Sequence, residues 1–150
     1  SYPNGCHVAE VEVDPDTGGV EIVRYTAVGD CGNILERTVL EGQVHGGVAQ
    51  GLGQALLEHM LYDNDSGQIL SGSFMDYGMP RAADVPPITV MHHSIPCQTN
   101  TVGAKGVGES GTTAAPCAIV NAVLDAVGKI DDPGLQMPLT PQKVWRALHG

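Results

Sequence analysis

The sequence predicts an α+β fold, in which an antiparallel or mixed sheet packs with a long glycine-rich helix, an alanine-rich helix and a short C-terminal helix. Three observations support this prediction. Two β-branched runs flank a turn within residues 6–28, apolar residues recur at helical spacing over 38–58, and strand-like and helix-like segments are interspersed. Because 150 residues can bury one core and no linker interrupts them, we expect residues 1–150 to form a single domain.

The first predicted elements are the two strands of a hairpin. Valines alternate with acidic residues over 6–13, and residues 20–28 are β-branched and aromatic, which favours strands. Between them lies the turn-forming run Asp14-Pro15-Asp16-Thr17-Gly18-Gly19. Further along, the pattern predicts a short strand, a turn, a loop containing glycine and proline, and another strand, at 59–62, 64–67, 72–88 and 88–94 respectively.

Two helices are predicted in the last third of the chain. The alanine-rich segment 113–127 has Thr113 as a candidate N-cap, and Pro116 would then lie in the first turn, where its missing N–H costs nothing. Residues 140–148 begin with a Thr-Pro pair, which places a capping residue before a proline at the first helical position. We expect Trp145 to anchor this short helix to the core.

Glycines and glutamines mark one face of the long predicted helix. Each of its five glycines costs roughly 0.8–1 kcal/mol relative to alanine, so their presence needs a compensating reason. At about 100° per residue, Gln43, Gln50 and Gln54 form one stripe with glycines on both sides. The opposite face is apolar and consists of Val44, Val48, Leu52, Ala55, Leu56 and His59. Either a flat, heteroatom-rich ligand such as a pterin or nucleobase approaches the glycine face, or the glycines allow tight helix packing and the glutamines are solvated.

A second glycine-rich segment, residues 99–111, leads into the predicted alanine-rich helix. Free N–H groups and the positive end of the helix dipole favour an anion there. The segment matches neither the P-loop nor the dinucleotide-binding pattern. Glu109 lies at its end, where a carboxylate has two possible roles: a general base held in a tight loop, or simple complementation of the helix dipole.

Charge and composition exclude several classes of function. Lys and Arg number 7 against 17 Asp and Glu, and the resulting net charge of −10 repels nucleic acids and anionic membranes. No apolar window reaches the roughly 18–20 residues of a membrane span, and no signal-peptide pattern is present. The four cysteines lack paired spacing, which favours buried free thiols in a reducing compartment and hence a cytoplasmic location.

Other polar residues carry weaker signals. His92 and His93 are adjacent in a predicted strand and so point to opposite faces, and we expect no metal site built from side chains. An ion pair among Asp76, Arg81 and Asp84 is expected to hold the proline-containing loop. The chain lacks an initiating Met and its first strand begins almost at once, so we expect a truncated or cleaved form.

Five segments together resemble one protein family, the molybdenum-binding large subunit of the xanthine dehydrogenase and aldehyde oxidase family. The similarity is greatest to its aerobic carbon-monoxide-dehydrogenase-like branch. The segments are the helix sequence EGQVHGGVAQGLGQAL, the pair FMDY and MPRA, the loop GAKGVGE, the opening PNGCHVAEVE and the closing LTPQKVWRAL, at 41–56, 74–82, 103–109, 3–12 and 139–148 respectively. They run nearly end to end in the family's order.

The resemblance implies that residues 1–150 are the C-terminal cofactor-binding domain of a longer subunit, part of a molybdenum-dependent oxidoreductase and inactive alone. Glu109 corresponds to the general base, which removes a proton from the molybdenum-bound hydroxyl before its oxygen attacks the substrate carbon. Gln43 corresponds to a glutamine that hydrogen-bonds the pterin. The further cofactor-binding candidates are Gly46, Gly47, Gln50, Thr101, Gly103, Lys105, Gly106 and Gly108.

The same resemblance implies the cofactor and the partners. The cofactor is expected to be molybdopterin with molybdenum, as the cytosine dinucleotide, held through the pterin rather than by side chains. Iron-sulfur clusters and FAD are expected on partner subunits or domains, and the remainder of the large subunit completes the site. The substrate would be an aldehyde, an N-heterocycle or a similar small molecule, and we expect the chain alone to self-associate. The alternative is a non-catalytic cofactor-binding or assembly module with the same fold.

Overall fold

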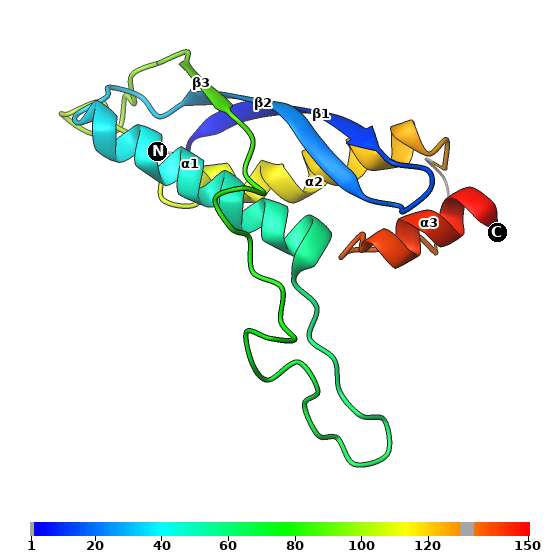
Figure 1. Cartoon of the computed structure of the whole chain (residues 1–150). Helices are drawn as coiled ribbons and strands as arrows, with labels where there is room; N and C mark the ends of the chain where they lie inside the picture. Colours follow the sequence, from blue (N-terminus) through cyan, green and yellow to red (C-terminus); the bar gives the residue numbers. More distant parts are fainter. Residues whose placement is uncertain (1, 130–133) are drawn as a thin grey trace.

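The computed structural model describes residues 2–129 and 134–150, and it confirms the α+β class (Figure 1). Two long strands open the chain, two helices follow with a short strand between them, and a third helix closes it. In order, the elements are β1 (Asn4–Val13), β2 (Val20–Asp30), α1 (Arg37–Leu52), a π-helical turn (Gly53–Leu57), β3 (Ile88–His92), α2 (Ser110–Ala126) and α3 (Pro141–His149).

The sheet is mixed, with the strand order β1-β2-β3. The predicted hairpin is confirmed: β1 and β2 pair antiparallel, from Asn4 opposite Asp30 to Val13 opposite Val20. The third strand lies parallel to β2 and ends at His92, two residues before the predicted end. An irregularity in the pairing after Glu10 shifts the alternation of β2, so that Ile22, Tyr25 and Ala27 all face the core.

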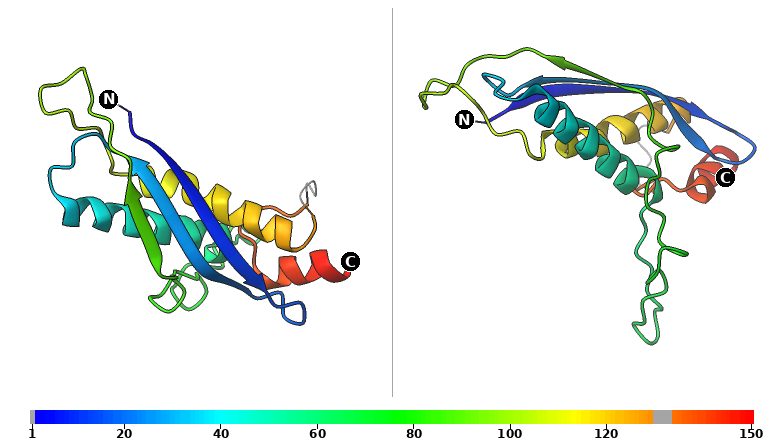
Figure 2. Two further views of the ribbon diagram at one scale, coloured as in Figure 1. Left: turned by 90° about the horizontal axis from the view of Figure 1, so that it is seen from above. Right: turned by 60° about the vertical axis from the view of Figure 1, so that its left-hand side comes forward.

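Helices α1 and α2 cover one face of this sheet (Figure 2). The predicted apolar back of α1 is confirmed except for His59, which lies beyond the helix. Tyr25 is completely buried, and its hydroxyl is 2.8 Å from His7 Nδ1. Burial raises the pKa of Tyr25 and lowers the pKa of His7. The buried core consists of Ile22, Tyr25, Ala27, Val44, Val48, Leu52, Ala55, Leu56, Ala115, Ile119, Val123, Leu135, Leu139 and Val144.

The predicted start of the alanine-rich helix was wrong, because α2 begins at Ser110. Thr113 is therefore not the N-cap, and its hydroxyl donates instead to the Glu109 carbonyl oxygen, 3.0 Å away. Pro116 consequently lies in the helix interior, where its ring nitrogen cannot bond to the carbonyl four residues back. The proline is buried against α1 at Gly51, where a Cβ would lie 2.9 Å from the proline Cδ. The helix therefore lacks one backbone hydrogen bond at the position where the Pro116 ring is buried against α1.

The C-terminal helix begins as predicted, with Thr140 before Pro141, but Trp145 is not its anchor. Val144 is completely buried, whereas 42% of Trp145 is exposed and its ring stacks on His149 with centroids 4.7 Å apart. The backbone of this helix packs against the hairpin turn. Gly18 has a φ of +71°, and a Cβ there would lie 2.6 Å from the Trp145 backbone nitrogen.

The segment between the π-helical turn and β3 forms an arm that extends away from the body (Figures 1 and 2). The strand predicted at 59–62 was wrong, because only Tyr62 and Ile69 pair in an isolated bridge. A single pair of strand segments with few buried side chains cannot sustain a ladder. The loop predicted over 72–88 is confirmed up to the start of β3, since residues 72–87 contain no helix or strand.

Two other predictions about side chains need correction. The described residues show no ion pair at Arg81; its backbone N–H donates to the Asp84 carboxylate (2.7 Å), while Asp76 accepts from the Ser73 hydroxyl (2.9 Å). Short loops favour such local bonds to backbone over long side-chain pairs. The four cysteines are free, but only Cys31 is buried, and Cys6 and Cys117 are exposed. Within the described ranges, no helix is long and apolar enough to cross a membrane.

The arm carries the most exposed large apolar side chains of the described chain outside Tyr2, with Phe74 at 80% and Met75 at 93%. We expect the 150-residue chain, expressed alone, to self-associate through them, because contiguous exposed apolar surface associates in water. Sedimentation velocity should show a concentration-dependent shift that Phe74→Ser with Met75→Ser abolishes. The control is Tyr2→Ser, which removes an equally exposed ring away from the arm. A monomer at every concentration would contradict the prediction.

Candidate functional site

The two glycine-rich segments meet where α1 crosses the first turn of α2. A Cβ on Gly47 would lie 2.7 Å from the Thr112 nitrogen and 2.8 Å from Gly111 Cα, and a Cβ on Gly111 would lie 2.6 Å from the Val44 carbonyl oxygen. The Thr112 hydroxyl also donates to the Gly47 carbonyl oxygen at 3.2 Å. Two helices approach this closely only when neither carries a side chain at the crossing.

This crossing separates the helix glycines into two groups. Gly47 and Gly51 pack against α2, and Gly53 packs against the Pro80 ring, so tight packing explains these three. At Gly42 and Gly46 an added Cβ would have no atom within 4 Å, and neither residue has a positive φ. Nothing in the described chain requires glycine at these two positions. Tight packing is therefore confirmed for three of the five glycines, and the approach of a ligand stays a prediction for Gly42 and Gly46.

The glutamine amides lie on the open side of α1. Gln43 and Gln50 are both exposed, as the helical spacing predicts. The Oε1 atom of Gln50 is 3.5 Å from the Thr112 hydroxyl, which places this amide beside the first turn of α2. The Gln43 side chain has no hydrogen-bond partner among the described residues. Its donors and acceptor are available to a ligand.

The loop before α2 is fixed at its beginning by backbone contacts. Gly103 has a φ of +72°, and its carbonyl oxygen accepts the N–H groups of Asn33 and Cys97, each at 2.9 Å. Asn100 bonds on both sides of it, accepting the Gly103 N–H at 2.6 Å and donating to the Ala104 carbonyl oxygen at 2.9 Å. Gly103 is thus required by the loop's own conformation, whereas Thr101 is exposed.

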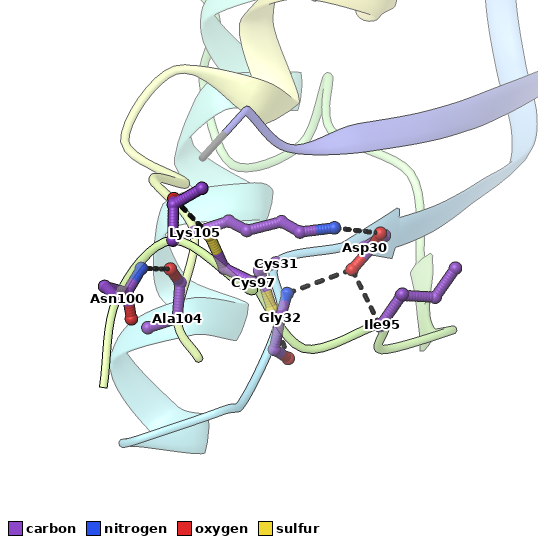
Figure 3. Close-up of polar contacts among 9 residues, drawn as sticks. Asp30, Cys31, Gly32, Ile95, Cys97, Asn100, Ala104 and Lys105 are labelled. Carbon is purple, nitrogen blue, oxygen red and sulfur yellow. Dashed lines mark hydrogen bonds and ion pairs between the residues drawn. The ribbon is translucent and has the colours of Figure 1, made fainter. Parts of the chain in front are cut away.

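Lys105 reaches out of this loop to the end of β2 (Figure 3). Its ammonium lies 2.5 Å from Asp30 Oδ2, and the two side chains are only 12% and 10% exposed. The other oxygen of Asp30 accepts the N–H groups of Ile95 and Gly32, both at 3.0 Å. The bond from Ile95, together with those from Lys105 and Gly32, lowers the pKa of Asp30 to about 2. The carboxylate is therefore ionised throughout the neutral range.

Beyond Lys105 the loop is open. At Gly106 and Gly108 an added Cβ would have no atom within 4 Å, and neither residue has a positive φ. Glu109 occupies the N-cap position of α2, yet its carboxylate is exposed and accepts no hydrogen bond from the described residues. The N–H of Gly111 likewise has no acceptor in the described part of the chain. A free carboxylate and a free helix-end donor therefore lie within three residues of each other.

A cavity of about 200 Å³ lies beside this turn, between the end of the sheet and the two helices. Its lining includes Ser110 and Thr113 of α2 together with His7 and His92 from the strands. The Nε2 atom of His92 is buried without a hydrogen-bond partner in the described structure. No group of three or more His, Cys, Asp or Glu side chains in the described ranges is arranged to hold a metal ion.

Residues 1–86 match the family model of the molybdopterin cofactor-binding domain, which is more than half of the chain. The chain belongs to this family. The match includes α1 and its glutamine face. The resemblance predicted from the five sequence segments is thereby confirmed.

Relatives of this family extend the similarity through the Glu109 loop to α3. The nicotine 6-hydroxylase large subunit of Paenarthrobacter nicotinovorans is 42% identical over 149 residues, 99% of this chain and 18% of the relative. The carbon monoxide dehydrogenase large chain of Hydrogenophaga pseudoflava is 34% identical over 148 residues, again 99% and 18%. Quinoline 2-oxidoreductase from Pseudomonas putida 86 superposes with a TM-score of 0.92 at 39% identity, covering 98% of this chain and 19% of that one. The chain thus spans about a fifth of the relatives it matches.

The residues present fit a pterin cofactor. A pterin is flat and rich in donors and acceptors, and the open face of α1 offers an unpaired amide beside two glycines that no internal contact requires. The start of α2 adds the positive end of a helix, which suits the anionic groups of such a cofactor. Gly47, Gly103 and Lys105, by contrast, are occupied by contacts within the chain.

Sequence reasoning missed Asp30, which the structure joins to the predicted Lys105. The two residues are 75 positions apart, and nothing near either one marks the pairing. Sequence reasoning also placed Gly47 on the open face, because a helical wheel shows which side a residue faces but not which neighbour fills it.

Proposed function

We propose that this domain binds the pterin of a molybdenum cofactor and supplies the general base of a molybdenum hydroxylase. One observation carries the proposal. The glycines without an internal reason and the unbonded Glu109 carboxylate belong to the two segments that meet at the crossing of α1 with α2. The similarity to large subunits of molybdenum oxidoreductases supports it. The domain acts within a longer subunit and has no turnover alone.

The proposed cofactor contacts divide by role. Gln43 and Gln50 hydrogen-bond the pterin, and Gly46 lets its flat face reach the helix backbone. Thr101, Gly106 and Gly108 line the loop side of the site. Gly47, Gly103 and Lys105 shape the site by holding α1, α2 and the loop in place. The cofactor is the cytosine dinucleotide form.

Glu109 takes up the proton that the reaction releases. When bound, the cofactor supplies the two-electron oxidation of the substrate carbon. The Glu109 carboxylate is exposed and unbonded, so it accepts a proton without first breaking a contact within the chain.

The remaining partners are proposed from the same similarity. The rest of the large subunit completes the site and covers surface that is exposed here, and iron-sulfur and FAD subunits or domains accept the electrons. The substrate is an aldehyde, an N-heterocycle or a similar small molecule, the assembly is oligomeric and its location is cytoplasmic. A non-catalytic assembly module is the second candidate, which the exposed apolar side chains of the arm favour.

The cofactor content of the complete protein tests cofactor binding. We expect Gln43→Ala and Gly46→Leu to lower the molybdenum and pterin released from the purified protein, because one removes an amide and the other fills the open face. The matched control is Gln142→Ala, an exposed amide on α3 away from the site. Full cofactor content in both site variants would contradict the assignment of this face. Absence of molybdenum and pterin from the unsubstituted complex with every partner present would favour the assembly module.

A further inference from the structure

We propose that Asp30 is a positioning residue for Glu109, because its carboxylate fastens the loop that carries this glutamate. The inference rests on the proposed function, in which Glu109 is the base. Asp30 is the last residue of β2, and neither its sequence context nor the family match assigns it a role. Its importance comes from the segments that its side chain connects.

A single carboxylate joins three parts of the chain at this point (Figure 3). One oxygen accepts the N–H of Gly32 in the turn after β2 and the N–H of Ile95 in the segment after β3. The other oxygen receives the ammonium of Lys105 from the glycine loop. Asp30 is 8% exposed as a whole residue, so its bonds are sheltered from water.

Glu109 lies between two fixed points. On one side Lys105 is held by Asp30 and by the bond from its own N–H to the Cys31 carbonyl oxygen, 2.8 Å long. On the other side Gly111 is held in the crossing with α1. Between these points, the Val107 carbonyl oxygen accepts the N–H and hydroxyl of Ser110, and the open glycines on either side of Val107 let this stretch adjust if the Lys105 side chain is released. The position of the carboxylate therefore depends on the anchor at Asp30.

Replacement of Asp30 by asparagine removes the ion pair with Lys105 and keeps the other hydrogen bonds of this side chain. The amide oxygen of the new side chain can still accept from Gly32 and Ile95, but its NH₂ group would face the Lys105 ammonium, and two donors cannot bond to each other. The backbone bonds at Gly103 are unaffected by this change. Asp30→Asn thus releases the lysine side chain, while the bond from the Lys105 N–H to the Cys31 carbonyl oxygen and the beginning of the loop stay in place.

Hydrogen exchange in the complete protein provides a readout that does not depend on turnover. We expect the amides of residues 106–109 to exchange at least about tenfold faster in Asp30→Asn, while those of α3 keep their rates. The matched control is Glu41→Gln, the same chemical change in the exposed pair with Arg37, whose N–O distance is 2.7 Å. Unchanged exchange over 106–109 in Asp30→Asn would overturn the proposal.

Kinetics distinguish positioning from a general loss of stability. We expect kcat of Asp30→Asn to fall about 10- to 100-fold with KM unchanged, since misplacing a catalytic group acts on the transition state. Val144→Ala weakens the buried face of α3 instead and should leave kcat unchanged at a temperature where both variants are folded. An equal loss of kcat in both variants, or none in Asp30→Asn, would overturn the positioning role.

Failure of the proposed base and failure of its positioning give different results. If Glu109→Gln keeps full turnover, the proposed base is wrong, and no positioning of it can matter. If Glu109→Gln loses turnover but Asp30→Asn changes neither the exchange of 106–109 nor kcat, the base stands and the positioning role is wrong.

Discussion

Glu109→Gln in the complete, cofactor-loaded protein is expected to lower kcat by about 10²–10⁴-fold, the usual contribution of a general base. Glutamine has nearly the same shape as glutamate but cannot take up a proton at neutral pH. Because the Glu109 carboxylate has no hydrogen-bond partner in the described chain, the substitution breaks no internal contact. Steady-state turnover, normalised to molybdenum content, measures the effect.

The control for this substitution is Glu12→Gln, an exposed glutamate on β1. It should leave kcat and cofactor content unchanged. Folding of Glu109→Gln is checked by its unfolding midpoint, which should equal that of the parent. Turnover at the parent rate, with equal molybdenum content, would show that another group accepts the proton.

The second large effect concerns the free energy of unfolding. We expect it to change in opposite directions when two neighbouring glycines of α1 are replaced by alanine. Gly47→Ala should lower the free energy of unfolding by about 1–3 kcal/mol, because its Cβ would press on the backbone of α2 at Thr112 and Gly111. Gly46→Ala should raise it by about 0.5–1 kcal/mol, because its Cβ meets open space and alanine favours the helix. Urea unfolding of the 150-residue chain measures both.

The same two variants distinguish the effect of a glycine on helix packing from its effect on cofactor binding. In the complete protein, Gly46→Ala should reduce pterin content although it stabilises the helix, since its methyl group lies on the proposed cofactor face. Equal stability changes of one sign in the two variants would contradict the division of the glycines into packed and open positions. Normal pterin content in Gly46→Ala would contradict the proposed contact between Gly46 and the pterin, but not the division of the glycines.

Elements with a strong local pattern could be predicted from the sequence. The hairpin follows from β-branched alternation around a turn, and the apolar back of α1 follows from helical spacing of Val44, Val48 and Leu52. The start of α2 could not, because Ser110 and Gly111 are poor helix formers by themselves. Packing of Gly111 against Gly47 draws them into the helix, and that contact joins two distant parts of the chain.

The candidate site shows the same limit. Composition identified where glycines accumulate, and the resemblance supplied roles for Glu109 and Gln43. The sequence alone does not distinguish a glycine that a neighbouring backbone requires, such as Gly47 or Gly103, from one that faces open space, such as Gly46. That distinction depends on which backbone lies opposite, which is a property of the fold. The pairing of Asp30 with Lys105 could not be predicted for the same reason.

The unused cap at the start of α2 bears on how the domain would tolerate the proton transfers proposed for Glu109. An N-cap carboxylate ordinarily accepts a hydrogen bond from an N–H of its own helix, and protonation makes it a weaker acceptor for that bond. Glu109 occupies the position without making the bond, and the Thr113 hydroxyl instead bonds to its main-chain carbonyl oxygen. Binding of a proton by the side chain would therefore break no hydrogen bond of the helix. In the proposed role of Glu109, the first turn of α2 would stay intact each time the side chain takes up a proton and gives it back.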